Sequence, residues 1–353
     1  IIGGGVNNTD TVRKNLLTVA ETLDVPVSQT LMANGVVPDE YEGFVGMVGM
    51  HGTTDGNYAI QNCDVLLAVG MRFDDRVTSD TKRFSVKSKK IHVDIDASEI
   101  GKNVQVDVPI VGDAEEFFEL LAREVDDRKT EHRAWRQEIK DHYRPLRHGD
   151  ANTLPPMELC GIINDQIDEN TVVVTDVGQH QMWAALFLHP KGPRRFLTSG
   201  GLGTMGYGLP AAIGAQFGKK DDKVFLITGD GSFQMNLQEL CIIKERRVPV
   251  KIVLMNNGYL GMVRQWQEMF NDANYAATTL DVGPDWEKLA SAYDIPYYNI
   301  ANLDQAKEEL PGLLNGEGPV FIECMINKFS NVYPMIPAGS SLDDIVGEFE
   351  DEA

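Results

Sequence analysis

The sequence predicts an α/β protein with two doubly wound parallel-sheet domains, and three observations support this. Short apolar segments typical of strands alternate with helical patterns along the 353 residues. A charged stretch, residues 126–154, interrupts the alternation and ends just before Pro155 and Pro156. The alternation then starts again, so we expect one domain on each side of a charged helical linker.

The first domain is expected to span residues 1–125. Its strands are expected at residues 1–2, 26–28, 64–70, 90–95 and 108–111, with helical patterns between them. The chain begins without a methionine, inside what we expect to be the end of a strand. We therefore expect it to be a fragment of a longer protein.

The second domain is expected to span residues 155–330. Its strands are expected at residues 171–176, 223–228, 250–255 and 320–325. Residues 331–353 are rich in Pro, Gly and Ser and end in acidic side chains, a composition that favours a mobile C-terminal tail.

The composition limits the classes of partner. Acidic side chains outnumber basic ones by 53 to 32, which gives a net charge of −21. A field of this sign opposes nucleic acids and anionic membranes, so we expect neither as a partner. There is no apolar run of about 18 residues that could span a membrane. The four cysteines lie far apart, which is typical of a reducing compartment. We expect a soluble cytoplasmic protein; an organelle stays open because we expect the natural N-terminus to be missing.

One segment of the second domain places polar residues at two strand ends. The letters GDG at 229–231 follow one expected strand, and Asn256-Asn257 follow the next. The separation of Asp230 from Asn257 fits one βαβ unit, with a helix expected at 233–244. Because parallel strands direct their carboxyl ends to one crevice, we expect both motifs to face the same ligand.

These residue types suit a metal ion bound together with a pyrophosphate. Mg²⁺ prefers oxygen ligands and commonly shares them with phosphates. Asp230 offers a carboxylate and Asn257 an amide oxygen, while the glycines let the backbone approach a pyrophosphate. A GDG turn alone is also common in unrelated loops. The two motifs together favour the metal site.

Further motifs surround this unit. They are SGGLGTMGYGLPAAIGAQ at 199–216, VTDVGQHQMWAA at 174–185, NNGYLGMVRQWQ at 256–267 and, in the first domain, GMHGTTDGNYAIQNCDVLLAVGMRFDDRVT at 49–78. Together they resemble the thiamine-diphosphate-dependent decarboxylases and carboligases, and among these the catalytic subunit of acetohydroxyacid synthase, also called acetolactate synthase. The resemblance covers nearly the whole chain, but the family's subunit begins with a further domain.

The resemblance implies a thiamine diphosphate and Mg²⁺ site in the second domain. Asp230, Asn257 and the backbone carbonyl of Tyr259 are expected to bind the metal. The expected cofactor-binding residues are Val177, Gly178, Gln179, His180, Gly203, Met205, Gly229, Gly231, Ser232, Gly261 and Met262. Met205 is also expected to serve catalysis, as the apolar support that brings the two rings of the cofactor together. Without the family pattern this methionine would be placed in the core.

The resemblance also implies FAD in the first domain, with a structural role because the reaction involves no net redox change. The expected contacts are Gly3, Gly4, Gly5, Thr30, Leu31, Met50, His51, Gly70, Arg72, Asp74, Arg76, Asp94, Ile95, Asp113 and Ala114. A glycine triplet or a single histidine would be weak evidence by itself.

Two residues are expected to set substrate choice. Arg76 resembles the arginine that receives the carboxylate of the second 2-oxo acid through a charge-assisted contact. Its alternative is an ion pair with Asp74 or Asp75. Trp266 is expected to line the substrate channel, close to Met50 across the domain interface; its alternative is core packing.

The implied activity is the condensation of two pyruvates, or of pyruvate and 2-oxobutyrate, to 2-acetohydroxy acids with loss of CO₂ in branched-chain amino acid biosynthesis. The implied partners are further copies of the chain, in a dimer or tetramer, and a regulatory small subunit. Two alternatives stay open. One is a pyruvate oxidase or another FAD-containing carboligase, and the other is a non-catalytic nucleotide-binding module.

The family uses a glutamate from its upstream pyrimidine-binding domain. No segment of this chain resembles that domain, and Glu239 belongs to the diphosphate-binding domain. A general acid–base group typically contributes 10²–10⁴-fold in rate. We therefore expect the chain alone to bind thiamine diphosphate weakly and to form no acetolactate until the upstream domain is added.

Overall fold

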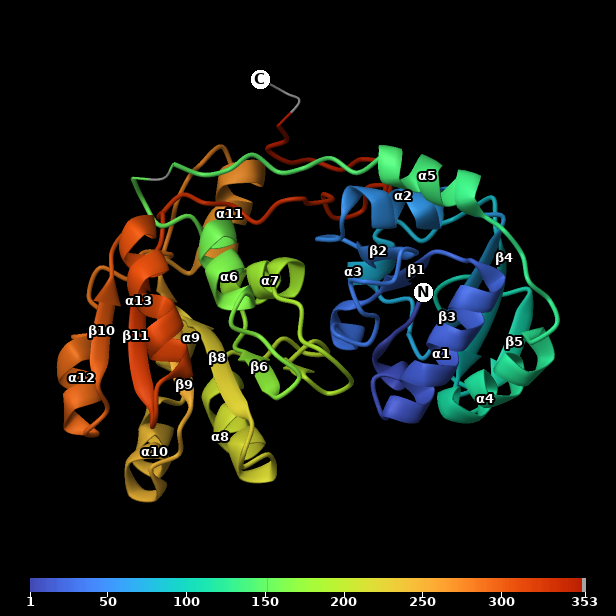
Figure 1. Cartoon of the computed structure of the whole chain (residues 1–353). Coiled ribbons are helices and arrows are strands. Elements are labelled where there is room, and N and C mark those ends of the chain that lie inside the picture. The colour runs from blue at the N-terminus through green and yellow to red at the C-terminus, as the bar shows by residue number, and fades with distance from the viewer. Residues whose placement is uncertain (151, 351–353) are drawn as a thin grey trace. The chain divides into compact units, whose positions relative to one another are not determined.

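The computed structural model describes residues 1–150 and 152–350, which form two compact units (Figure 1). The first comprises Ile1–Arg147, Lys191–Arg194 and the C-terminal segment from Tyr333, and the second comprises His148–Pro190 and Arg195–Val332. Each unit contains a parallel sheet with helices packed against it. The predicted fold class is confirmed.

Strands and helices alternate in the first unit. Its strands are β1 (Val27–Gln29), β2 (Phe44–Met47), β3 (Val65–Val69), β4 (Lys89–Asp94) and β5 (Val108–Val111). Its helices are α1 (Asp10–Leu23), α2 (Thr54–Asn62), α3 (Asp75–Thr78), α4 (Ala114–Val125) and α5 (Arg133–Asp141). Side-chain oxygens of Thr9 and Asp113 accept backbone N–H bonds at the starts of α1 and α4, which fixes where these helices begin.

The sheet of the first unit reverses its strand order once. β1 pairs with β2, β3 with β4 and β4 with β5, all in parallel. Ile2 forms parallel bridges with both Gln29 and Val69. The spatial order is therefore β2, β1, Ile2, β3, β4, β5, and the reversal lies between Ile2 and β3. Doubly wound sheets bind dinucleotides at such a reversal.

The C-terminal segment packs against the first unit, so the prediction of a mobile tail is wrong. Met335 pairs with Val346, and Leu146 pairs with Phe349, in antiparallel bridges. Ile336 and Phe349 are 0% and 1% exposed. The composition of this segment is typical of a loop, but its scattered apolar residues anchor it.

The second unit contains six strands and eight α-helices within the described residues. The strands are β6 (Thr171–Thr175), β7 (Phe196–Leu197), β8 (Lys223–Gly229), β9 (Lys251–Asn256), β10 (Tyr297–Ile300) and β11 (Val320–Met325). The helices are α6 (Pro156–Asn164), α7 (Gln179–Phe187), α8 (Gly208–Gly218), α9 (Asp230–Phe233), α10 (Leu240–Arg246), α11 (Gly261–Phe270), α12 (Trp286–Ala292) and α13 (Leu303–Asn315). All strands are parallel, in the order β7, β6, β8, β9, β11, β10. The order reverses between β6 and β8.

The single helix predicted at 233–244 is wrong. The chain forms α9, a 3₁₀ turn at Leu237–Glu239 and then α10. Asn236 leaves the helical backbone conformation, and its Nδ2 donates a hydrogen bond to the carbonyl of Gly206 at 2.7 Å. This tertiary contact replaces the continuation of the helix.

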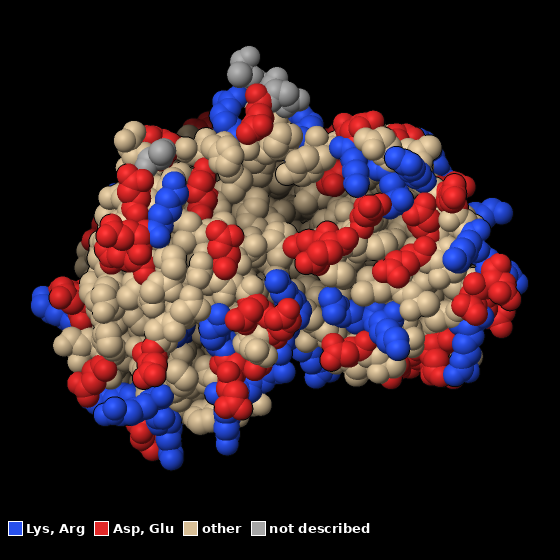
Figure 2. Space-filling model, viewed as in Figure 1, with Lys and Arg blue, Asp and Glu red and all other residues tan. Residues whose placement is uncertain are grey.

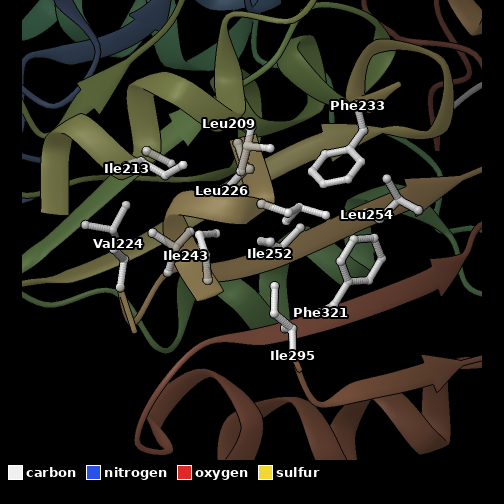
Figure 3. Packing of buried hydrophobic residues seen from close by; sticks show 14 of the residues in the cluster. Leu209, Ile213, Val224, Leu226, Phe233, Ile243, Ile252, Leu254, Ile295 and Phe321 are labelled. Carbon is white, nitrogen blue, oxygen red and sulfur yellow. The ribbon is translucent and has the colours of Figure 1, made fainter. Parts of the chain in front are cut away.

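The core of the second unit lies between its central strands and helices α8, α9 and α10 (Figure 3). Val224, Leu226, Ile252 and Leu254 on β8 and β9 are fully buried. Strands covered on both faces require continuous apolar sequence, which is why these two were predictable. Each such side chain contributes about 1.5–3 kcal/mol on burial.

Both signs of charge occur together on the surface. Figure 2 shows Lys and Arg interspersed with Asp and Glu over the visible face. Across residues 1–150 and 152–350, every helix is too short or too polar to cross a membrane.

Candidate functional site

The carboxyl ends of β6, β8 and β9 meet at the reversal of the second sheet. A cavity of about 110 Å³ lies there. Its lining contains Val177, Gly178, Gln179, His180, Met205, Gly229, Asp230, Gly231, Ser232, Asn257, Tyr259, Gly261 and Met262. The fold thus brings together thirteen of the fourteen residues predicted for the cofactor and the metal. Gly203 is exposed and lies outside this lining.

Asp230 places a buried carboxylate in the cavity wall. Its Oδ1 accepts a hydrogen bond from the N–H of Gly231 at 3.0 Å, and its Oδ2 accepts one from the N–H of Gly258 at 2.8 Å. Burial raises the pKa of Asp230 to about 6, although these hydrogen bonds act in the opposite direction. A bound cation would stabilise the buried negative charge.

Asn257 and Tyr259 supply further oxygen atoms at the same cavity. The Nδ2 of Asn257 donates to Oε1 of Gln179 at 3.2 Å, and its Oδ1 accepts from the N–H of Tyr259 at 3.0 Å. Within the described residues no group of three His, Cys, Asp or Glu side chains could hold a metal. A metal here therefore depends on amide and backbone oxygens as well as on Asp230, a donor set that fits Mg²⁺.

His180 lines the cavity and is buried. It is 5% exposed, and its Nε2 has no hydrogen-bond partner in the part of the chain that the structure describes. Burial lowers its pKa to about 3, so the ring is neutral near pH 7. A buried polar atom without a partner fits a ligand that completes its hydrogen bonding.

Glycine is required at the end of β8. A Cβ atom added to Gly229 would lie 2.7 Å from Nδ1 of His180. A side chain at this position would therefore displace the imidazole that lines the cavity.

Asp176 does not line the cavity but holds a segment that does, and it was not among the predicted residues. Its Oδ1 accepts from the N–H of Gly206 at 2.8 Å, and its Oδ2 accepts from the N–H of Gly208 at 3.0 Å. These bonds hold the loop that carries Met205 against the end of β6. The sequence feature that could have indicated Asp176 is its position directly after the apolar run TVVVT. Met205 itself is only partly buried, so core packing does not account for it.

Trp266 lies on α11, with its ring centroid 5.3 Å from that of Phe270. It is partly buried and does not line the 110 Å³ cavity. The neighbouring Arg264 and Gln265 are fully buried instead. Partial exposure disfavours core packing, and the role in a substrate channel stays a prediction.

In the first unit, predicted flavin contacts lie at the reversal of the sheet. The N–H of Gly3 donates to the carbonyl of Val69 at 2.9 Å, and that of Gly5 to the carbonyl of Gly70 at 3.0 Å. Gly70 has φ of +63°, and a Cβ on it would lie 2.7 Å from Cα of Gly5. These two glycine segments therefore approach more closely than larger residues allow.

Other predicted flavin residues occupy the ends of neighbouring strands. They are Thr30 and Leu31 after β1, Asp94 and Ile95 at the end of β4, and Asp113 and Ala114 after β5. Met50 and His51 follow β2 and are buried. Burial lowers the pKa of His51 to about 4.

Three of the predicted charged residues, Arg72, Asp74 and Arg76, lie in α3 or just before it. Arg72 pairs with Asp74 at 3.0 Å. Arg76 lies 3.6 Å from Asp75, with 65% and 77% of these two side chains exposed. Such an exposed pair contributes little, so Arg76 stays accessible to an anion.

A second cavity, of about 340 Å³, was not predicted. Its lining consists of Asp230, Gln234, Asn256, Leu280, Gly283, Pro284, Asp285, Trp286, Glu287, Tyr297 and Glu323. The hydroxyl of Tyr297 donates to Glu323, and the Nδ2 of Asn256 donates to Oε1 of Glu323 at 2.6 Å. Burial and the bond to Glu323 raise the pKa of Tyr297. The lining comes from distant segments, so no local pattern indicated it.

Comparisons with known proteins agree with this geometry. The family model of the thiamine pyrophosphate enzyme C-terminal TPP binding domain matches residues 176–324, and that of the thiamine pyrophosphate enzyme central domain matches residues 1–121. The chain therefore belongs to the thiamine pyrophosphate enzymes.

Within this family the chain is similar to acetolactate synthase subunits. It is 42% identical to the probable acetolactate synthase large subunit of Methanocaldococcus jannaschii, 41% to the acetolactate synthase isozyme 2 large subunit of Escherichia coli and 40% to the chloroplastic acetolactate synthase 1 of Nicotiana tabacum. Each comparison covers 98% of this chain. The chain spans 60%, 62% and 54% of the lengths of these relatives, respectively.

Proposed function

We propose that the chain forms the flavin-binding and thiamine diphosphate-binding parts of an acetolactate synthase large subunit. The proposed reaction condenses two pyruvates, or pyruvate and 2-oxobutyrate, to a 2-acetohydroxy acid with loss of CO₂. The observation that carries this proposal is the meeting of Asp230 and Asn257 in one cavity at the sheet reversal. Relatives that bear this name share about 40% of the residues over 98% of the chain.

Asp230, Asn257 and the backbone carbonyl of Tyr259 would hold Mg²⁺ in this proposal. The buried carboxylate of Asp230 supports this role because a cation would offset the cost of burying its charge. Gly231, Ser232 and the segment 177–180 would surround the diphosphate. The unpartnered Nε2 of His180 supports that placement.

When bound, thiamine diphosphate supplies a carbon nucleophile for the 2-oxo acid and accepts the electrons released by decarboxylation. Met205 would press an adaptable apolar surface against the cofactor and exclude water from it. Asp176 would keep Met205 in place through its bonds to Gly206 and Gly208. These residues orient the reacting groups without taking part in proton transfer.

FAD would bind along the strand ends of the first unit. The strand order and the close approach of Gly5 to Gly70 support a dinucleotide there. Its proposed role is structural, because the condensation involves no net oxidation.

Arg76 would bind the carboxylate of the second 2-oxo acid, and Trp266 would form a wall of the substrate channel. The exposure of the Arg76 guanidinium supports its role, since its contact with Asp75 leaves donors available. Two of the relatives are large subunits by name. A regulatory small subunit and a homodimer or homotetramer are the corresponding proposed partners.

Two measurements test the proposal. Calorimetric titration of the chain with thiamine diphosphate should show binding that requires Mg²⁺, and the purified chain should bind FAD. Absence of both would favour a non-catalytic module. In the complete gene product, acetolactate formed without oxygen uptake is the expected result. Acetyl phosphate together with peroxide would instead identify a pyruvate oxidase.

A further inference from the structure

Three buried side-chain amides form a continuous hydrogen-bonded series at the candidate metal site. The Nε2 of Gln179 donates to Oε1 of Gln265 at 2.8 Å, and the Oε1 of Gln179 accepts from Nδ2 of Asn257 at 3.2 Å. None of the three residues is more than 5% exposed. The series connects α7, α11 and the segment after β9.

Backbone groups set the polarity of this amide series at both ends. The N–H of Val332 donates to Oε1 of Gln265 at 2.8 Å, while Nε2 of Gln265 donates to the carbonyl of Val332 at 3.1 Å. At the other end the N–H of Tyr259 donates to Oδ1 of Asn257. A backbone N–H can only donate and a carbonyl can only accept, so a single orientation of each amide satisfies all these bonds.

Additional contacts agree with the same orientation. The Nε2 of Gln179 also donates to the carbonyl of Ser330 at 3.1 Å, so its nitrogen faces two acceptors. A Cβ on Gly261 would lie 2.8 Å from Cδ of Gln179 and 3.0 Å from Nδ2 of Asn257. Glycine at 261 thus leaves room for the bond between these two amides.

We propose that Gln265 is a positioning residue for the candidate metal ligand Asn257. Acting through Gln179, it keeps the nitrogen of the Asn257 amide turned away from the cation and leaves the oxygen for coordination. The same contacts connect the metal site to the segment 330–332. Gln265 does not itself line the 110 Å³ cavity. This inference rests on the proposed function, because it requires a cation between Asp230 and Asn257.

A double-mutant cycle with Gln265→Met and Asn257→Asp tests this role. Methionine preserves the length of the side chain but offers no amide acceptor to Gln179. We expect Gln265→Met to raise about tenfold the Mg²⁺ concentration for half-maximal thiamine diphosphate binding, because outer partners of metal ligands typically change affinity 10–100-fold. The two oxygens of an aspartate are equivalent, so an aspartate needs no partner to turn an oxygen toward the cation. In the Asn257→Asp protein, the same substitution should change the Mg²⁺ requirement less than about twofold, or lower it.

An equal loss in both backgrounds would show a merely structural role for Gln265 and overturn the proposal. If Gln265→Met does not fold, Gln179→Met removes the same link and leaves the contacts of Gln265 with Val332 in place. The cycle is then run with that variant. Because Gln179 also lines the cavity, its substitution should weaken binding in both backgrounds, and the expected result is a larger loss in the Asn257 background; equal losses would overturn the proposal.

A second readout needs no ligand and separates this proposal from the proposed function. Nuclear magnetic resonance of the folded chain should show slowly exchanging side-chain amide protons for Gln179, and Gln265→Met should speed the exchange of the proton donated to Gln265, while the bond to the carbonyl of Ser330 stays. Unchanged exchange would overturn the positioning role. Failure of the unsubstituted chain to bind thiamine diphosphate with Mg²⁺ would instead contradict the proposed function.

Discussion

The carboxylate of Asp230 accepts a hydrogen bond from the backbone N–H of Gly258 at 2.8 Å, across the ends of two neighbouring strands. β8 and β9 pair in parallel with Gly229 opposite Met255, so the residues that follow each strand meet at one edge. Gly258 has φ of +69°, which glycine adopts without strain. The strand register thus brings Asp230 next to the turn that carries Asn257 and Tyr259.

Asp230→Ala should abolish Mg²⁺-dependent binding of thiamine diphosphate. Loss of a charged metal ligand costs more than the roughly 1.5–3 kcal/mol of a hydrogen bond to a charged group, so affinity should fall by more than about 100-fold. Calorimetry measures this change. Asp221→Ala, at an exposed position in the same unit, is the matched control. FAD binding should be the same in both variants, and tight thiamine diphosphate binding by Asp230→Ala would rule out the metal site.

The stability of the metal-free chain should depend on pH through Asp230. Its folded-state pKa of about 6 lies above the ordinary value of 3.8. The native state therefore binds this proton more tightly, and the contribution of Asp230 to stability falls as pH rises from about 4 to 6. Asp230→Asn should raise the free energy of unfolding by about 1–3 kcal/mol at pH 8 and change it little near pH 4.

Urea denaturation with a chelator present measures both proteins at each pH. Comparison of the variant with its parent cancels the titration of all other groups. The same difference at both pH values would contradict the burial of an ionised Asp230.

Gly70→Val should prevent FAD binding. The substitution places a branched side chain at φ of +63° and against Cα of Gly5, where a Cβ would already be only 2.7 Å away. Flavin absorbance after gel filtration measures the bound fraction. Gly101→Val serves as the control because Gly101 also has a positive φ, +74°, but a Cβ there meets no atom within 4 Å. Full flavin occupancy in Gly70→Val would exclude the sheet reversal as the flavin site.

Trp266→Leu should change the preference between pyruvate and 2-oxobutyrate as second substrate in the complete gene product. One methylene in an apolar pocket changes selectivity by about 1–3 kcal/mol, so the product ratio should change within that limit. Chromatography of the two 2-acetohydroxy acids measures the ratio. Phe217→Leu, at an exposed position of α8, is the control. An unaltered ratio in Trp266→Leu would remove Trp266 from the channel.

The sequence predicted those strands whose burial demands an uninterrupted apolar run. β8 and β9 are of this kind. β2, β7 and β10 were missed for local reasons: β2 contains Gly46, β7 has two residues, and β10 exposes Tyr298. The C-terminal segment was misjudged because the burial of Phe349 depends on its pairing with Leu146, which no local pattern reveals.

The residues of the candidate site also differ in whether the sequence could predict them. Asp230 and Asn257 were predictable because strand-end polar residues keep a fixed spacing in a βαβ unit. Asp176 and Gln265 were not, because their roles come from partners that are distant in sequence. Gln265 binds Val332, which lies 67 positions away.

The most direct test is a crystal structure of the chain with thiamine diphosphate and Mn²⁺ in place of Mg²⁺, using the anomalous signal of manganese. We expect one strong peak within coordination distance of Oδ of Asp230, Oδ1 of Asn257 and the carbonyl oxygen of Tyr259, next to the diphosphate. A peak in the cavity of about 340 Å³, beside Asp285 and Glu323, or a bound cofactor without metal at Asn257, would contradict the proposed metal site.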